Sequence, residues 1–292
     1  MKKPRIGIVG FGVVGRSLAE LFGDDAVTLD VGATDKDHAA VNACDLAFVC
    51  VPTPSNEDLT CDTSIVEQCV RWIESPLIVI RSTVAPGTTD RLRQETGKRV
   101  LFQPEYLGET VAHPLTDQKQ RSFIILGGQP DDCAAVADIY QNYFHSELRF
   151  YFSSSVAAEV AKYMENSFYA VKVMFCNEFY DIARAHGLEY QELRELWLAD
   201  WRISRDHTFV YPDNRGFSGK CLPKDVSAII QSSLEKGVEP KLLKAAMAVN
   251  ETHRSDDPAY RQYLGSDEKF QPKGKGEAKA APSCKVKAKA KK

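Results

Sequence analysis

The sequence predicts an α/β chain in which a doubly wound parallel sheet is followed by a mainly α-helical region. Short apolar runs recur over roughly the first 150 residues, and helical patterns with apolar residues three and four apart separate them. A stretch without glycine or proline then extends from 156 to 186, which is typical of one long helix. With 292 residues, 43% of them hydrophobic, the chain can form two cores.

Six apolar runs are the expected strands of the sheet. They lie at 5–9, 27–30, 45–51, 77–80, 100–102 and 123–126. The run at 77–80 is continuously apolar, as in strands that a parallel sheet buries on both faces. Helical patterns follow Gly15 and cover 64–72. We therefore expect a sheet domain over residues 1–152.

The second region is expected to be a helical domain over residues 153–265. Its long first helix has a candidate N-cap at Ser154 or Ser155, and Gly187 follows its end. Further helical patterns cover 188–201, 225–236 and 241–253, whereas 212–223 is typical of a loop. Residues 266–292 are a low-complexity, lysine-rich tail with too few apolar residues to fold.

Charge and cysteine content exclude several classes of protein. Residues 268–292 carry a net charge of +7 and the remainder −10, and an acidic body disfavours binding to nucleic acid. No apolar run is long enough to cross a membrane and none is typical of a signal peptide, so we expect a cytoplasmic protein. The 8 cysteines include no C-x-x-C pair, which indicates reduced thiols and no structural metal site.

A glycine-rich turn is the first motif with chemical meaning. Gly10, Gly12 and Gly15 follow a strand and open a helix, and Asp30 ends the next strand. Such glycines let the backbone approach a pyrophosphate at a helix N-terminus. The acid would accept hydrogen bonds from the ribose diol and repel a 2′-phosphate, so the motif predicts binding of NAD rather than NADP. The alternative interpretation of the motif is an ordinary tight turn that binds nothing. The expected contacts here are Gly10, Phe11, Gly12, Val13, Val14, Gly15 and Asp30.

Three loops follow other strands of the predicted sheet, at 51–54, 81–89 and 103–109. Ligands bind beyond the carboxyl ends of parallel strands, so these loops are well placed, although each alone is also ordinary turn chemistry. Glu105 and Glu109 are four residues apart and would share one face if their segment is helical. Two interpretations are open: both carboxylates are simply solvated, or one of them is a general base.

Two features of the helical domain also have chemical potential. Lys162 and Asn166 are four residues apart, so they point to the same side, either as a surface pair or as a binding site for an oxyanion. Cys221 lies in a glycine-rich loop with Lys220 and Lys224, and such lysines favour the nucleophilic thiolate. Of the cysteines, this one has the surroundings most suggestive of reactivity.

In their order along the chain, these motifs resemble those of the UDP-glucose/GDP-mannose dehydrogenase family. The matching segments are 10–15, 51–54, 82–89, 104–109, 158–166, 177–178, 200–203 and 216–225, and they cover nearly everything before the tail. The resemblance implies a Rossmann domain and the oxidation of a sugar nucleotide, with UDP-glucose expected, from the C6 alcohol to the carboxylate. Two NAD molecules would take up the two hydrides.

The resemblance also implies residue roles. Cys221 would attack the intermediate aldehyde, and the thiohemiacetal would become a thioester that water hydrolyses. Lys162 and Asn166 would stabilise oxyanions, and Glu105 would be the base for hydrolysis. Thr83 and Asp225 would hold the water or assist proton transfer. Further cofactor contacts would be Val51, Pro52, Thr53, Ser82, Thr83, Glu109 and Lys224. Substrate contacts would be Glu105, Tyr106, Leu107, Lys162, Asn166, Arg202, Gly216, Phe217 and Cys221.

The sequence departs from the family pattern at several places. We find no counterpart of the family's second Rossmann domain, which helps to bind the nucleotide. The stretch between Asp30 and Asp45 is shorter, and Gly108 replaces an arginine. Arg205 competes with Arg202 for the role of substrate arginine, which the resemblance places across a homodimer. The helix that begins near Pro240 would be the dimer element.

Two alternative functions remain open beside this one. A two-electron dehydrogenase of a smaller hydroxy acid or sugar would have no use for the Cys221 thiol. A non-catalytic NAD-binding partner of a longer relative would not need Lys162, Asn166, Cys221 and Asp225 together, yet all four are present.

Overall fold

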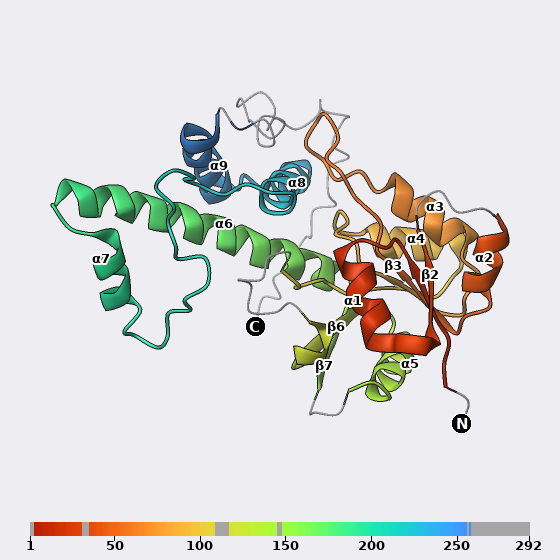
Figure 1. The fold of residues 1–292 in the computed structure, drawn as a ribbon. Coiled ribbons are helices and arrows are strands. Elements are labelled where there is room, and N and C mark those ends of the chain that lie inside the picture. The colour runs from red at the N-terminus through yellow and green to blue at the C-terminus, as the bar shows by residue number, and fades with distance from the viewer. Residues whose placement is uncertain (1–2, 31–34, 109–116, 145–147, 256, 258–292) are drawn as a thin grey trace, which may run out of the picture.

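The computed structural model describes residues 3–30, 35–108, 117–144, 148–255 and 257, and it contains a seven-stranded sheet (Figure 1). The strand order is β2-β1-β3-β4-β5-β6-β7. The strands are β1 (Ile6–Val9), β2 (Ala26–Leu29), β3 (Leu46–Val49), β4 (Ile78–Ile80), β5 (Val100–Phe102), β6 (Phe123–Gly127) and β7 (Arg149–Ser153). The predicted α/β fold class is confirmed.

The sheet differs from the prediction at one edge. Strands β1 to β5 pair in parallel, but β6 runs antiparallel to β5, with Phe102 opposite Gly127. Strand β7, which was not predicted, pairs in parallel with β6. The helix α5 (Pro130–Gln141) connects these two parallel strands, as a crossover requires. The predicted parallel sheet is therefore confirmed except at the β5–β6 pair, which is antiparallel.

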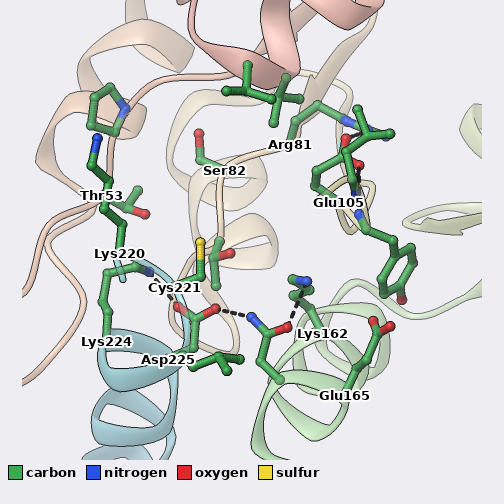
Figure 2. Close-up of a pocket in the computed structure, with 18 of the residues that line it drawn as sticks. Thr53, Arg81, Ser82, Glu105, Lys162, Glu165, Lys220, Cys221, Lys224 and Asp225 are labelled. Atoms are coloured by element: carbon green, nitrogen blue, oxygen red, sulfur yellow. Dashed lines mark hydrogen bonds and ion pairs between the residues drawn. The ribbon is translucent and has the colours of Figure 1, made fainter. Parts of the chain in front are cut away.

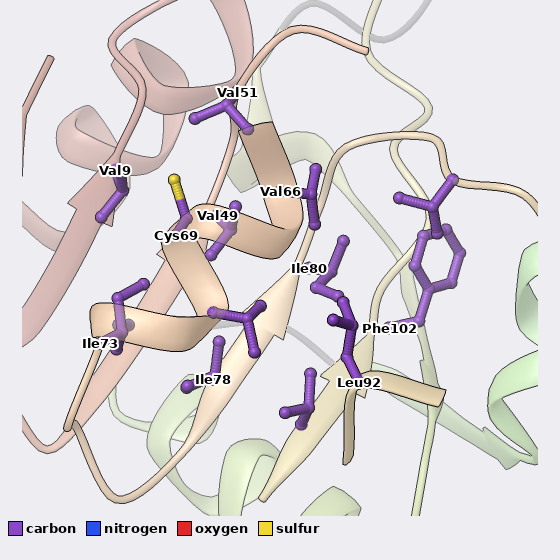
Figure 3. Packing of buried hydrophobic residues seen from close by; sticks show 14 of the residues in the cluster. Val9, Val49, Val51, Val66, Cys69, Ile73, Ile78, Ile80, Leu92 and Phe102 are labelled. Atoms are coloured by element: carbon purple, nitrogen blue, oxygen red, sulfur yellow. The ribbon is translucent and has the colours of Figure 1, made fainter. Parts of the chain in front are cut away.

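Helices cover both faces of the sheet. On one face lie α2 (Asp35–Asn42), α3 (Ser64–Trp72) and α4 (Thr88–Thr96), over a core that includes Val49, Val66, Ile78, Ile80 and Leu92 (Figure 3). On the other face, α1 (Val13–Phe22) and α5 pack over Ile8, Leu18, Phe48 and Tyr140. Central strands buried on both faces explain the continuous apolar runs in the sequence.

The helical domain is built on α6 (Ser155–Ala185), a helix of 31 residues that begins with Ser154 as its N-cap. The Ser154 hydroxyl accepts a hydrogen bond from Ala157 N at 3.2 Å. Helices α8 (Leu222–Glu235) and α9 (Lys241–Arg254) lie on one side of α6, and α7 (Tyr190–Trp197) lies near its far end (Figure 1). No helix among the residues that the structure describes is long and apolar enough to cross a membrane.

A buried carboxylate joins the first turns of α6 to the sheet domain. Glu159 is inaccessible to solvent, and it accepts hydrogen bonds from Gly87 N at 2.6 Å and Thr89 N at 2.9 Å. Burial raises the pKa of Glu159, and these bonds at the N-terminus of α4 oppose that effect. These two hydrogen bonds attach α6 to the start of α4, and they thereby set the position of the following turns of α6 relative to the sheet domain.

Candidate active site

A cavity of about 560 Å³ lies between the carboxyl ends of the parallel strands and the helical domain (Figure 2). The sheet domain contributes Val13, Val14, Cys50–Ser55, Arg81–Thr83 and Glu105–Gly108. The helical domain contributes Lys162, Glu165, Asn166, Tyr169, His207, Lys220–Leu222, Lys224 and Asp225. The structure thus brings together the loops predicted from the sheet and the residue pairs predicted from the helices. All six expected catalytic residues line this cavity.

The glycine turn beside the cavity fits a dinucleotide. Gly10 has a φ of +94°, and a Cβ there would lie 2.5 Å from the Cys50 carbonyl oxygen. A Cβ on Gly15 would lie 2.0 Å from the Gly10 carbonyl oxygen, whereas one on Gly12 would meet nothing within 4 Å. Gly12 is the N-cap of α1 and so leaves open space where a pyrophosphate would approach the helix N-terminus.

The acid of the same motif lies at the end of β2, next to this turn. Phe11 N donates a 3.4 Å hydrogen bond to Asp30 Oδ1, so the carboxylate is held beside the glycines, where a ribose diol would follow the pyrophosphate. Val13, Val14 and the 51–53 segment line the cavity, and the Ser82 hydroxyl donates to the Val51 carbonyl at 2.6 Å. Of the expected cofactor contacts, Glu109 lies outside the described residues.

The thiol expected to react is at the opposite wall. Cys221 immediately precedes α8, where the helix N-terminus favours a thiolate, and Lys220 and Lys224 line the cavity beside it. Among the cysteines in the described ranges, Cys221 alone is exposed. Cys50 also lines the cavity, but burial raises its pKa to about 12. Cys221 is therefore the thiol that can act as a nucleophile here.

A hydrogen-bonded chain connects α6 to α8 below this thiol (Figure 2). Lys162 Nζ donates to Asn166 Oδ1 at 3.0 Å, which confirms that these two side chains point to the same side. Asn166 Nδ2 donates to Asp225 Oδ2 at 2.6 Å, and Lys224 Nζ donates to Asp225 Oδ1 at 2.6 Å. Burial alone would lower the pKa of Lys224, but the buried Asp225 carboxylate raises it. An ammonium and an amide held in this way can stabilise an oxyanion.

Glu105 lies on the loop after β5, and its carboxylate is enclosed by donors. It is ion-paired with Arg81 and, at 2.6 Å, with Arg121, and it accepts from Tyr106 N at 2.6 Å and Leu107 N at 2.7 Å. Burial alone would raise the pKa of Glu105, but the two arginines and the backbone donors lower it to about 2. A carboxylate in this state accepts a proton poorly. The expected role of Glu105 as a general base is not favoured by this environment.

Several expected substrate contacts do not reach the cavity. Arg202 is exposed and ion-paired with Asp200 at 2.6 Å, and Arg205 is ion-paired with Glu195 at 2.7 Å. Neither arginine lines the cavity, so the choice between them is not resolved by this pocket. Gly216 and Phe217 also lie outside it; Phe217 is buried in the core of the helical domain.

Other residues line the cavity without having been predicted. Tyr169 donates from its hydroxyl to Glu165 Oε1 at 3.2 Å and stacks on His207, with ring centroids 4.1 Å apart. Glu165 and Tyr169 lie three and seven residues after Lys162, so the helical period could have identified them. No sequence pattern indicated His207, which lies in the connection between α7 and α8. Two further lining residues, Cys50 and Ser55, flank the predicted 51–54 loop and had not been predicted. Pro54, Arg81 and Gly108 belong to the three predicted loops, and Lys220 and Leu222 belong to the predicted Cys221 segment.

A dinucleotide-binding sheet domain that closes a pocket with a helical domain is the architecture of NAD-dependent dehydrogenases, and this chain has it. Residues 11–144 match the NAD-binding domain of the UDP-glucose/GDP-mannose dehydrogenase family, and 156–252 match the central domain of the same family. The chain belongs to the UDP-glucose/GDP-mannose dehydrogenase family. This confirms the resemblance and the expectation of NAD as cofactor.

Individual relatives agree with the family. The UDP-glucose 6-dehydrogenase of Haloferax volcanii is 29% identical over 84% of this chain and 69% of its own length. A UDP-glucose dehydrogenase structure from Pyrobaculum islandicum is 26% identical, with a TM-score of 0.74, over 86% of this chain and 68% of that one. The chain spans little more than half of several other curated relatives, at 52%, 53% and 58% of their length.

One further structure shares the fold at low identity. The 3-hydroxyisobutyrate dehydrogenase of Mycobacterium tuberculosis is 16% identical, with a TM-score of 0.68, over 90% of this chain and 98% of that one. At this identity the likeness concerns the fold alone.

Proposed function

We propose that this protein oxidises the C6 alcohol of a nucleotide sugar to the carboxylate, with UDP-glucose as substrate and NAD as oxidant. The observation that carries the proposal is the exposed thiol of Cys221, in a pocket that lies beside the glycine turn and also contains the hydrogen-bonded pair of Lys162 and Asn166. Oxidation of an alcohol to an aldehyde does not need a thiol. Oxidation of the aldehyde to the acid can use one, because the thiol converts the aldehyde into an alcohol-like adduct that can lose a second hydride.

The sheet domain would hold the cofactor. The pyrophosphate would lie at the N-terminus of α1 above Gly12, and Asp30 would accept hydrogen bonds from the ribose diol. The loops at 51–53 and 82–83 would contact the part of the cofactor that enters the cavity. When bound, NAD accepts a hydride in each of the two oxidations.

The helical domain would handle the reacting carbon. Loss of a hydride and a proton from the C6 alcohol gives the aldehyde, and the Cys221 thiolate then forms a C–S bond to it. Lys162 and Asn166 would stabilise the resulting oxyanion, and loss of a second hydride leaves a thioester on Cys221. Water then breaks the C–S bond, which releases the carboxylate and returns the thiol. Thr83 and Asp225 would hold this water.

In this proposal Glu105 orders the pocket instead of accepting a proton. Its Oε1 accepts hydrogen bonds from the backbone N–H groups of Tyr106 and Leu107, and these two residues line the cavity. Its ion pairs with Arg81 and Arg121 attach this loop to two neighbouring segments of the sheet domain. The function of the residue would be to hold the 105–107 loop rigid beneath the substrate.

We further propose that the protein acts as a cytoplasmic homodimer. The homodimer would form through α6, not through the helix near Pro240, because α6 has exposed apolar residues along its whole length. These residues are Val156, Val160, Met164, Phe168, Phe175, Phe179 and Ile182. A second copy on this face could also supply Arg202 or Arg205, which do not line their own pocket.

The oligomeric state tests this proposal. Light scattering should give a dimer for the wild type and a monomer for Phe168→Glu; a wild-type monomer would contradict the proposed homodimer. The cytoplasm would keep the cysteines reduced.

The test of the activity is the yield of NADH from UDP-glucose with excess NAD. We expect two NADH for each UDP-glucose, and at least a roughly thousandfold loss of steady-state turnover in Cys221→Ser. Cys69→Ser changes a buried thiol on α3 outside the cavity and should keep the yield of two. GDP-mannose should be tested beside UDP-glucose. No turnover with either sugar nucleotide, in a protein that still binds NAD, would leave the two-electron or the non-catalytic alternative.

A further inference from the structure

A buried asparagine on α9 contacts the loop that leads to Cys221. Asn250 is inaccessible to solvent, and its side chain makes two hydrogen bonds to one residue of that loop. Its Oδ1 accepts from Phe217 N at 2.7 Å, and its Nδ2 donates to the Phe217 carbonyl at 2.9 Å. The amide therefore pairs with the Phe217 backbone as a neighbouring strand would. Asn250 does not line the cavity, and its two hydrogen bonds join its side chain to the loop that leads there.

The same loop is held from the other side by α6. Asn177 Oδ1 accepts hydrogen bonds from Arg215 Nε at 2.6 Å and from Gly216 N at 3.1 Å. The Phe217 ring is buried in the core that α6, α8 and α9 share. Three consecutive residues, 215–217, are thus attached to two helices just before the chain reaches Cys221.

The close approach of Asn250 leaves room only for a glycine at position 216, between the two attached residues Arg215 and Phe217. Gly216 has a φ of +75°, which favours glycine, and a Cβ there would lie 2.4 Å from Asn250 Oδ1. The loop ends four residues after Phe217, where the Cys221 carbonyl accepts the Asp225 N–H at 2.8 Å as α8 begins. The short segment that carries the thiol is therefore anchored at Phe217 by Asn250 and at Cys221 by the first turn of α8.

We propose that Asn250 is a positioning residue for Cys221. By fixing the Phe217 backbone, it sets the angle at which the loop enters α8, and hence where the thiol lies relative to Lys162 and Asn166. The inference rests on the proposed function, because it takes Cys221 as the reacting group. It extends that function to α9, a helix without any residue in the cavity.

The test compares Asn250→Ala with Thr252→Ala, an exposed residue on the same helix whose hydroxyl donates to its own helix backbone. We expect Asn250→Ala to lower kcat by about 10- to 100-fold with an unchanged KM for NAD, because a small displacement of a reacting group has effects of this size. Alkylation of Cys221 by iodoacetamide, followed by peptide mass spectrometry, should also be slower than in Thr252→Ala. Cys221 is already exposed, so we expect the alkylation rate to report how well its position at the N-terminus of α8 favours the thiolate.

A second variant keeps the test decisive. Gly216→Ala pushes on the same amide from the loop side and also strains the backbone at a φ of +75°. Asn250→Ala removes the first of these two effects, so the double variant should lose less than the sum of the two single changes. If Asn250→Ala does not fold, Gly216→Ala and Asn250→Asp, which keeps the acceptor for Phe217 N, replace it. A folded Asn250→Ala with the alkylation rate and kcat of Thr252→Ala would overturn the inference, as would fully additive effects. If the wild type oxidises no sugar nucleotide, the proposed function fails, while the alkylation rates still decide the role of Asn250.

Discussion

The two halves of the pocket are built by different means. The glycine turn between β1 and α1 presents backbone, and its shape follows from close contacts such as that between Gly15 and the Gly10 carbonyl. The opposite half is made of side chains from distant parts of the sequence. Asn166 and Asp225, which share a 2.6 Å hydrogen bond, are 59 residues apart.

The half proposed to bind the cofactor is therefore specified differently from the half proposed to carry out the reaction. A backbone turn of six residues can be specified locally, because steric exclusion decides which residue types fit it. A reactive cluster needs charges and donors at fixed mutual distances, which only the packing of separate elements provides. Changes at the open position of the first half should therefore affect cofactor binding alone, whereas changes at its close contacts should also affect stability. Changes in the second half should affect stability and rate together.

The largest effect on stability is expected at Glu105. Glu105→Gln removes the charge that compensates the fully buried Arg81 and the nearly buried Arg121, and breaking a buried ion pair costs about 3–5 kcal/mol. Urea unfolding at neutral pH measures this loss. Glu165→Gln, at a half-buried carboxylate of the same cavity, is the matched control and should cost less than about 1 kcal/mol. Equal losses in the two variants would show that the ion pairs of Glu105 do not stabilise the fold more than an ordinary carboxylate of the cavity does.

The same carboxylate predicts a dependence of stability on pH. Its pKa is about 2 in the folded chain against an ordinary value of 4.5, so Glu105 contributes stability that is fully present above 4.5. That contribution, about 3 kcal/mol, is lost as the pH falls from 4.5 toward 2. Unfolding measured across this range should therefore show a smaller decline in Glu105→Gln than in the wild type. Parallel declines would contradict the prediction.

The next effect distinguishes two glycines of the turn. Gly15→Ala places a methyl group against the Gly10 carbonyl and should destabilise the sheet domain by about 1–3 kcal/mol or more, which calorimetry would detect. Gly12→Ala meets nothing within 4 Å, so the melting temperature should stay the same. Its methyl group would nevertheless occupy the space for the pyrophosphate and weaken NAD binding. A Gly12→Ala protein with wild-type affinity for NAD would show that the pyrophosphate binds elsewhere.

The smallest effect is expected at Asp30. Asp30→Asn removes the charge that repels a 2′-phosphate but leaves the turn in place, so the preference for NAD over NADP should fall by about tenfold. The ratio of the two dissociation constants measures this change, and the thermal stability should be nearly that of the wild type. An unchanged ratio would indicate that another group discriminates between the cofactors.

Most of the local structure could be predicted because its causes are local. The helix at 64–72 has the predicted bounds, and the long helix was predicted at 156–186 and found at 155–185. Spacing alone placed Lys162 and Asn166 on one side of α6. The glycine turn was predictable for a related reason, since only residues without a Cβ fit its close contacts.

Long-range features could not be predicted in this way. The antiparallel β5–β6 pair, the unpredicted β7 and the exclusion of Arg202 from the cavity depend on how connections run through space. The same is true of His207, which reaches the cavity by stacking on Tyr169.

The sequence by itself determined the α/β class, the cofactor turn and the set of reactive residue types, because steric fit and helical period act over a few residues. Only the tertiary structure decided what each group can do. Glu105 had the residue type of a base, but Arg81 and Arg121, 24 and 16 residues away along the chain, make it a buried ion pair. Burial and charge at a site are sums over all elements packed around it, and no single segment contains that sum.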